Sequence, residues 1–257
     1  MPAVLVAPSG TQTTFDGAVR RVNRLTGPSP DTRPPLPVNA ALAPLLPAGL
    51  PRGSAITVTG RPGGTSLALA MVGAASGSGS WCALVGLPPL PTEALLDFGF
   101  DLNRLAIIPA ATLTNGAQLT ALGALLDAVD VVVVRPPARV ADGDVRRLLA
   151  RTRSRAAVLV VLAADLQSWA GAQIRLQTHH VRWAGLDAVD PALPASGTAG
   201  GHGRLRCRQV AITRSGKGRP ANSTRPVSLW LPSATGGVEA VEPPSVTPLD
   251  TPLRRAG

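Results

Sequence analysis

Short apolar runs alternate with amphipathic segments through the central part of this 257-residue chain. The runs are rich in Val, Ile and Leu and predict strands, and the segments between them carry apolar residues at helical spacing. The predicted strands span residues 55–59, 81–86, 105–109, 130–134 and 157–162, and the predicted helices span residues 65–77, 92–99, 115–128 and 142–154. Strands that alternate with helices are typical of βαβ units, and near-continuous apolar strands are covered on both faces. The pattern therefore predicts an α/β fold with a mostly parallel, twisted sheet and helices on both faces.

The pattern changes beyond residue 163. Strands are predicted near 179–184, 204–214 and 226–231, and loops rich in Gly, Ser and Pro separate them. We expect these strands to be antiparallel and to close the sheet as a C-terminal extension.

Proline-rich and aperiodic segments divide the chain. A semi-rigid linker is predicted at 27–37, after a short amphipathic helix, and the last 25 residues lack any period. We therefore expect an N-terminal helix and linker (1–38), one core domain (39–232) and a disordered C-terminal tail (233–257).

Charge is the most unusual feature of the composition. The chain has 25 basic residues, of which Lys217 is the only lysine, against 15 acidic ones. A strongly basic balance favours contact with nucleic acid or with an acidic protein surface, and the sequence does not separate the two. No apolar run approaches the roughly 20 residues that span a bilayer, so we expect a soluble cytoplasmic protein. The two cysteines and three histidines lack ligand spacing, and no metal site is expected.

A glycine-rich loop joins the first predicted strand to the first predicted helix. This is the layout of a phosphate-binding P-loop, in which backbone amides and a helix N-terminus attract anions. The candidate residues are Gly60, Gly63, Gly64, Thr65 and Ser66. A working motif needs four residues between its outer glycines and then a lysine, whereas here three residues separate Gly60 from Gly64 and Thr65 takes the lysine position. The alternative interpretation is a tight turn that merely uses glycine.

Arginines share one face at two places in the predicted elements. On the strand near 204–214 the alternating set is Arg204, Arg206 and Arg208. On the helix near 142–154, and just past its end, the set spaced by four residues is Arg147, Arg151 and Arg155. The helical stripe is self-repulsive unless an anion or an acidic partner lies over it. Both sets are candidates for binding DNA or a partner protein, and a solvated face is the alternative for each.

The order and spacing of several motifs resemble the ATPase core of RecA recombinases over residues 40–232. The motifs are G-L-P-R-G-S (49–54), the degenerate loop, W-C-A-L-V (81–85), G-F-D-L-N-R-L (99–105) and D-V-V-V-V (130–134). Within that superfamily the chain is most similar to the ImuA-prime family, the RecA-like accessory proteins of the actinobacterial mutasome. G-S-W-C-A-L-V-G-L-P, D-V-V-V-V-R-P-P and G-H-G-R-L-R-C-R carry this similarity. The resemblance implies a RecA-like P-loop core and a role in damage-induced translesion DNA synthesis.

The departures from RecA fall on the residues that hydrolyse ATP. Thr65 replaces the P-loop lysine, Pro88 corresponds to the carboxylate that activates water, and Arg135 corresponds to the acid that closes the Walker B strand. An arginine at that last position repels Mg²⁺, and phosphoryl transfer depends on metal and phosphate charge neutralisation. The resemblance therefore implies a scaffold rather than an enzyme, with no cofactor and with ATP binding weak or absent.

We therefore expect a non-catalytic adaptor of the mutasome, associated with the nucleoid during DNA damage. Its implied partner is ImuB, an inactive Y-family polymerase homologue, and through it an error-prone replicative-type DNA polymerase, with DNA as a further candidate ligand and no membrane contact. Two alternatives remain open at this point. One is a nucleotide-dependent switch with residual ATP binding, and the other is a DNA-binding module that needs no partner.

Overall fold

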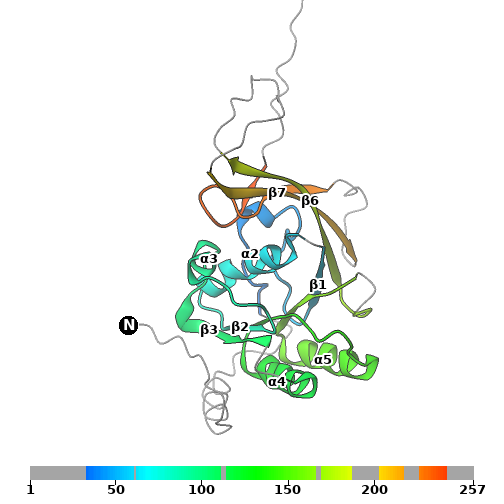
Figure 1. The fold of residues 1–257 in the computed structure, drawn as a ribbon. Helices are drawn as coiled ribbons and strands as arrows, with labels where there is room; N and C mark the ends of the chain where they lie inside the picture. The colour runs from blue at the N-terminus through cyan, green and yellow to red at the C-terminus, as the bar shows by residue number, and fades with distance from the viewer. Residues whose placement is uncertain are drawn as a thin grey trace, which may run out of the picture.

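One nine-stranded sheet organises the part of the chain that the computed structural model describes, namely residues 33–60, 62–110, 114–165, 169–186, 203–216 and 226–241. The strands lie in the order β3-β2-β4-β5-β1-β6-β7-β8-β9 (Figure 1). They are β1 (Ala55–Thr59), β2 (Cys82–Val85), β3 (Leu105–Ile108), β4 (Val131–Val134), β5 (Val158–Leu162), β6 (Ile174–Leu186), β7 (Gly203–Gly216), β8 (Val227–Trp230) and β9 (Glu239–Ala240).

The strands from β3 to β1 are parallel, as the apolar runs predict. Every residue of β1, β2, β4 and β5 is buried, which explains why these strands read as continuous apolar runs rather than as alternating ones. All five predicted strands of this half are confirmed to within one residue at either end.

Helices cover both faces of the parallel half. They are α2 (Gly64–Gly77), α3 (Thr92–Asp97), α4 (Asn115–Ala128) and α5 (Asp142–Arg155). The side chains of α2 share one apolar cluster with those of α3, and α4 and α5 contribute to a second cluster on the opposite face. Acidic residues in the first turn of α5 and arginines in its last turn complement the helix dipole.

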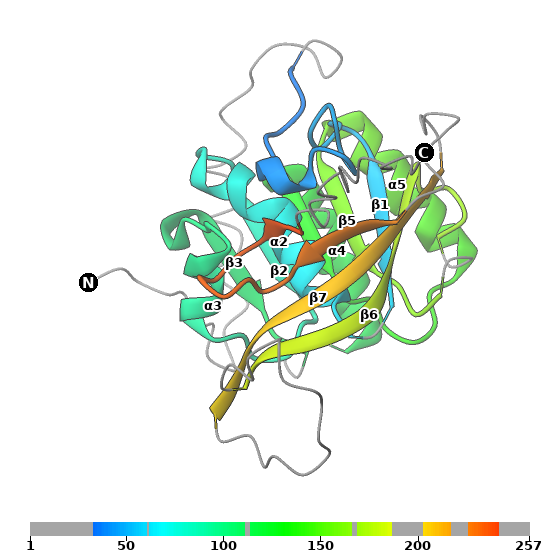
Figure 2. The ribbon, with the colours of Figure 1, turned by 90° about the horizontal axis from the view of Figure 1, so that it is seen from above.

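The extension differs from the expected arrangement at its first strand. β6 begins at Ile174 and pairs in parallel with β1, so it continues the parallel sheet before it pairs antiparallel with β7. β8 and β9 then add antiparallel strands. The sheet curls around α2, because buried residues of β6, β7 and β8 belong to the same apolar cluster as that helix (Figure 2).

The range expected for the core domain, 39–232, is too short at both ends. Leu36 is 3% exposed and pairs with Leu50, so the packed chain starts before residue 39. At the other end Ser233 and Val238 are buried and β9 pairs with β8, so the packed chain continues to residue 241 instead of ending at 232. The predicted N-terminal helix, most of the loops expected at 185–203 and 215–224, and residues 242–257 of the expected tail lie outside the described residues.

Candidate functional site

The glycine-rich loop lies at the carboxyl end of β1 and is pressed against β6. Gly60 has a φ of 103° and its Cα lies so close to Thr178 that a Cβ would overlap the Thr178 carbonyl oxygen. Gly63 caps α2 with a φ of 115°, which L side chains rarely adopt. The Thr178 hydroxyl donates to the carbonyl oxygens of Thr59 (3.2 Å) and Pro62 (3.4 Å) and fixes the loop on the strand. The shape of the turn therefore requires Gly60 and Gly63, whether or not the loop binds an anion.

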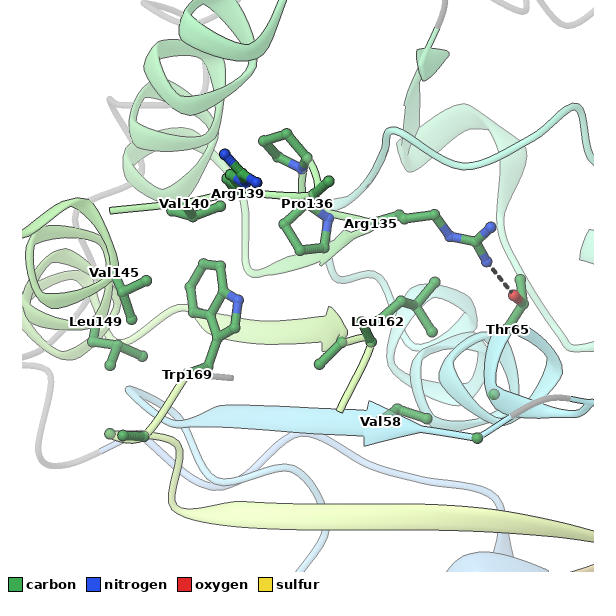
Figure 3. Close-up of a pocket in the computed structure, with 18 of the residues that line it drawn as sticks. Val58, Thr65, Arg135, Pro136, Arg139, Val140, Val145, Leu149, Leu162 and Trp169 are labelled. Carbon is green, nitrogen blue, oxygen red and sulfur yellow. Dashed lines mark hydrogen bonds between the residues drawn. The ribbon is translucent and has the colours of Figure 1, made fainter. Parts of the chain in front are cut away.

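Two arginines donate hydrogen bonds to the two hydroxyl groups of the loop. Arg135 follows β4 directly, and its Nη2 lies 2.9 Å from Thr65 Oγ1 (Figure 3). Arg208 on β7 places its Nη2 3.1 Å from Ser66 Oγ. The two hydroxyl groups that follow the glycines therefore each accept a hydrogen bond from a cation.

Arg208 is a buried arginine, not a member of a solvated ladder. It is 7% exposed, its Nε donates to the Leu231 carbonyl oxygen (3.1 Å), and its guanidinium carbon lies 4.9 Å from the centre of the Trp183 ring. Burial lowers its pKa below the ordinary arginine value. The solvated-face interpretation is wrong for this residue. Arg204 and Arg206 belong to β7, but their side chains lie outside the described part of the structure.

A wide cavity of about 1890 Å³ opens beside the loop. Its described lining contains all five candidate loop residues and four arginines, which are Arg135, Arg139, Arg146 and Arg208. Asp142 is the single carboxylate among the described lining residues, and it lies in the first turn of α5. Pro88 also lines the cavity and cannot transfer protons. The site therefore combines positive charge with a single described carboxylate, and Pro88 has no group that could act as a general base.

The far half of the cavity is apolar and centres on Trp169. Figure 3 shows its indole between Val145 and Leu149 on one side and Leu162 on the other. The ring is only 6% exposed, and the backbone has a φ of 65°, which is a strained conformation for so bulky a residue. The cavity thus has Arg135 and Arg208 at the loop and an apolar cluster under α5, with Arg139 beside Val140 and Arg146 on α5 itself (Figure 3).

The arginine stripe of α5 has an acidic partner from the same chain. Asp127 at the end of α4 accepts two hydrogen bonds from Arg151, at 2.7 and 2.6 Å, and one from Arg155 at 3.0 Å. This contact raises the pKa of Arg151. Arg147 pairs with Asp144 at 3.3 Å and its side chain is 84% exposed. All three arginines of the stripe thus have an acidic partner within the fold, Asp127 for Arg151 and Arg155 and Asp144 for the exposed Arg147.

Several lining residues had not been singled out from the sequence as site residues. Arg139, Arg146 and Trp169 lie in the cavity, and Arg135 had been identified only as a replacement for an acid. The usable signal was the stretch R-P-P-A-R at 135–139, since the segment after a parallel strand reaches the edge where ligands bind. Arg147, Arg151 and Arg155 are not among the residues that line the cavity.

No helix among the described residues has both the length and the apolar character needed to cross a bilayer. No group of three or more His, Cys, Asp or Glu side chains within that part of the chain is arranged to hold a metal ion.

Comparisons with known proteins agree with the geometry of the fold. Residues 44–171 match the family model described as the MT3502 N-terminal domain. The chain is 34% identical over 179 residues to the uncharacterized protein Rv3395c of Mycobacterium tuberculosis (strain ATCC 25618 / H37Rv), which covers 69% of this chain and 80% of the relative. A crystal structure of the RadB recombinase superimposes with a TM-score of 0.54 at 17% identity and covers 79% of this chain and 97% of that one. The chain therefore has a RecA-like fold and belongs to the family of the M. tuberculosis protein Rv3395c.

Proposed function

We propose that this protein is a non-catalytic RecA-fold adaptor of the mutasome in damage-induced translesion DNA synthesis. In this proposal it binds an ImuB-type inactive polymerase homologue and, through it, an error-prone replicative-type DNA polymerase. The observation that carries the non-catalytic part is the hydrogen bonding of Arg135 to Thr65 and of Arg208 to Ser66. The motif similarity to the ImuA-prime family supports the choice of partner.

Electrostatics at the loop opposes the metal that phosphoryl transfer needs. At an effective dielectric constant of about 20, two unit charges about 4 Å apart repel by roughly 4 kcal/mol, and Mg²⁺ carries two. Arg208 donates to the hydroxyl that would bind this ion, and Arg135 stands where the resemblance to RecA places the acid of the Walker B strand. In this proposal metal binding is opposed by both arginines, and Pro88 takes the position of the water-activating carboxylate.

The enzymatic half of the proposal is tested by nucleotide binding and turnover with the full chain. We expect no magnesium-dependent phosphate release above a buffer blank, because neither the metal nor an activated water can be held. Release that depends on magnesium and disappears in Ser66→Ala would refute a non-catalytic scaffold.

The adaptor half is tested by affinity capture. Tagged full-length protein should retain an ImuB-type partner with and without ATP, because no nucleotide-driven step is involved. Failure to retain the partner, with protein whose cooperative unfolding shows that it is folded, would refute the adaptor function.

One observation favours a second candidate, a nucleotide-dependent switch. Arg135 and Arg208 bring positive charge to the loop where a P-loop lysine would act, and guanidinium groups suit phosphate oxygens. Such a site would bind nucleotide equally well in the presence of a metal chelator, and Arg135→Ala would weaken that binding. A fluorescent nucleotide is titrated in the presence of magnesium and again in the presence of a chelator. A switch binds the nucleotide under both conditions, whereas the proposed adaptor binds it under neither.

A further inference from the structure

The antiparallel extension presents one sheet face that the described helices leave uncovered. Alternate residues of β6, β7 and β8 point inward and are buried, as Leu176, Val210 and Leu229 illustrate. The other face of these strands points away from α2. Figure 2 shows β6 and β7 running across the front of the molecule with no described helix in front of them. This outer face is therefore a surface open to a ligand.

The outer face is basic and polar. The three strands contain no Asp or Glu. Of their six arginines, Arg175 and Arg182 lie on the outer face, whereas Arg208 and Arg214 point inward and donate to Ser66 and to the Leu45 carbonyl oxygen. The side chains of Arg204 and Arg206 lie outside the described part of the structure. The described residues that alternate with the inward ones and so face outward are Arg175, Gln177, His179, Arg182, Ala184, Cys207, Gln209, Ala211, Thr213, Ser215, Ser228 and Trp230. A face of this composition attracts an anionic partner.

An arginine and a tryptophan are stacked at one end of this face. Arg182, Gln209 and Trp230 lie opposite one another on three neighbouring strands. The Nε of Arg182 donates to Gln209 Oε1 at 2.9 Å, and its guanidinium carbon lies 5.2 Å from the centre of the Trp230 ring. The hydrogen bond holds the planar guanidinium over the indole, and the Arg182 side chain itself remains exposed. This pair offers flat, cationic surface on which an unpaired base can stack.

The scarcity of large apolar side chains on the outer face favours nucleic acid over protein as the partner. A stable protein interface has an apolar core, whereas the apolar groups among these outward residues are the Trp230 ring and the small side chains of Ala184, Cys207 and Ala211. Interfaces with nucleic acid are more polar and more positively charged. Between Arg175 and Arg182 the strand extends about 20 Å, which suits the shortest single-strand sites of about four nucleotides.

We propose that the outer face of β6, β7 and β8 binds single-stranded DNA. A base stacks on the Arg182–Trp230 pair, and phosphates contact Arg175 and Arg182 along the strand. Duplex DNA fits less well because its bases are already stacked. The proposal depends on the proposed function only for the choice of DNA over RNA, and it does not require ImuB binding.

The test is a titration of the full-length protein, without partner, against fluorescent oligo(dT) at several salt concentrations. Arg182→Ala should weaken binding and reduce the slope of log K against log[salt] by about 0.7, the value for one lost phosphate contact on a single strand. Trp230→Leu should weaken binding by roughly fivefold or more and leave the slope unchanged, because it removes stacking but no charge. Arg153→Ala is the matched control, since it removes the same charge from an exposed position in the last turn of α5, and its affinity should stay within about twofold of the parent.

Several results would overturn the proposal. Equal losses in Arg182→Ala and Arg153→Ala would show that only net charge matters. Duplex DNA or polyglutamate that competes as well as oligo(dT) would show that the face does not select unpaired bases. Arg182 is exposed, so its replacement keeps the test valid even if Trp230→Leu unfolds.

Capture of an ImuB-type partner by the same variants separates this proposal from the adaptor function. We expect Arg182→Ala to retain the partner while it loses DNA. Loss of the partner with unchanged DNA binding would overturn the DNA site and leave the adaptor function standing. A parent protein that binds oligo(dT) but captures no partner would overturn the adaptor function alone.

Discussion

Gly73 in the middle of α2 provides a test in which two physical effects have opposite signs. Helix propensity predicts that Gly73→Ala stabilises the protein by up to about 1 kcal/mol. The structure predicts the reverse, because a Cβ on Gly73 would overlap the carbonyl oxygen of Phe98 and lie 2.7 Å from its carbonyl carbon. Phe98 caps α3 through its own N–H bond to Ala94, so relief of the clash requires that α3 move.

The magnitude follows from the kind of atom that is displaced. Overpacking typically costs about 1–3 kcal/mol, and a backbone carbonyl yields less readily than a flexible side chain. After the gain in helix propensity we expect Gly73→Ala to destabilise the fold by about 1–3 kcal/mol, which lowers the melting temperature by roughly 3–10 °C for a domain of this size. Urea and thermal unfolding, both followed by circular dichroism, measure the change.

The chain supplies matched controls for this substitution. Gly116 in α4 and Gly143 in α5 are also helical, and nothing lies within 4 Å of a Cβ built on either. Alanine at these two sites should leave stability unchanged or raise it by a few tenths of a kcal/mol to about 1 kcal/mol. A Gly73→Ala protein that is as stable as the parent would refute the close packing of α2 against α3.

Three further predictions concern individual side chains. Burial raises the pKa of Cys82 to about 12, so this thiol should resist iodoacetamide in the folded protein and react only after unfolding; rapid native labelling detected by mass spectrometry would contradict its burial. Asp127→Asn should lower the free energy of unfolding by about 1 kcal/mol at low salt and by less at high salt, because it removes the shared partner of Arg151 and Arg155; an equal loss at both salt concentrations argues against an ionic contribution. Hydrogen bonds from Thr235 and Ser233 lower the pKa of Glu239, so its stabilising effect is present above the unfolded-state pKa and is lost as the pH falls through the folded-state value. Glu239→Gln should therefore flatten the dependence of stability on pH in that acidic range, and an unchanged profile would show that these hydrogen bonds do not form.

The parallel half of the fold is predictable from sequence because its signals are local. Each buried strand is a continuous apolar run, and each helix begins and ends within a few residues of its pattern. The two-residue strand β9 carries no period that could reveal it, so its pairing with β8 becomes visible only in three dimensions. The parallel pairing of β6 with β1 was missed for a similar reason, because strand direction depends on how the connection crosses the sheet.

The candidate site was less predictable because its key contacts join distant parts of the chain. Alternation along β7 places Arg208 on one face of the strand, but only the packing of α2 decides that this face is covered. The arginine then meets Ser66, which is 142 positions earlier. The partner of the α5 stripe was hidden in the same way, since Asp127 reaches Arg151 only when α4 and α5 lie side by side. The sequence shows the type and spacing of each residue directly. Which side chains are buried, and which charges are paired, depends on how the helices pack on the sheet.

The curl of the sheet around α2 determines which stretch of this chain can fold by itself. The region that matches the family model ends at residue 171, before β6 begins. Leu176, Val210, Ile212 and Leu229 are fully buried in the cluster that includes α2, and all of them follow that end point. A fragment cut at residue 171 would keep an apolar helix and lose its cover, so it should associate or precipitate rather than fold. During synthesis this helix, which ends at Gly77, emerges long before β6, which begins at Ile174. The last third of the core therefore completes a stable, soluble unit.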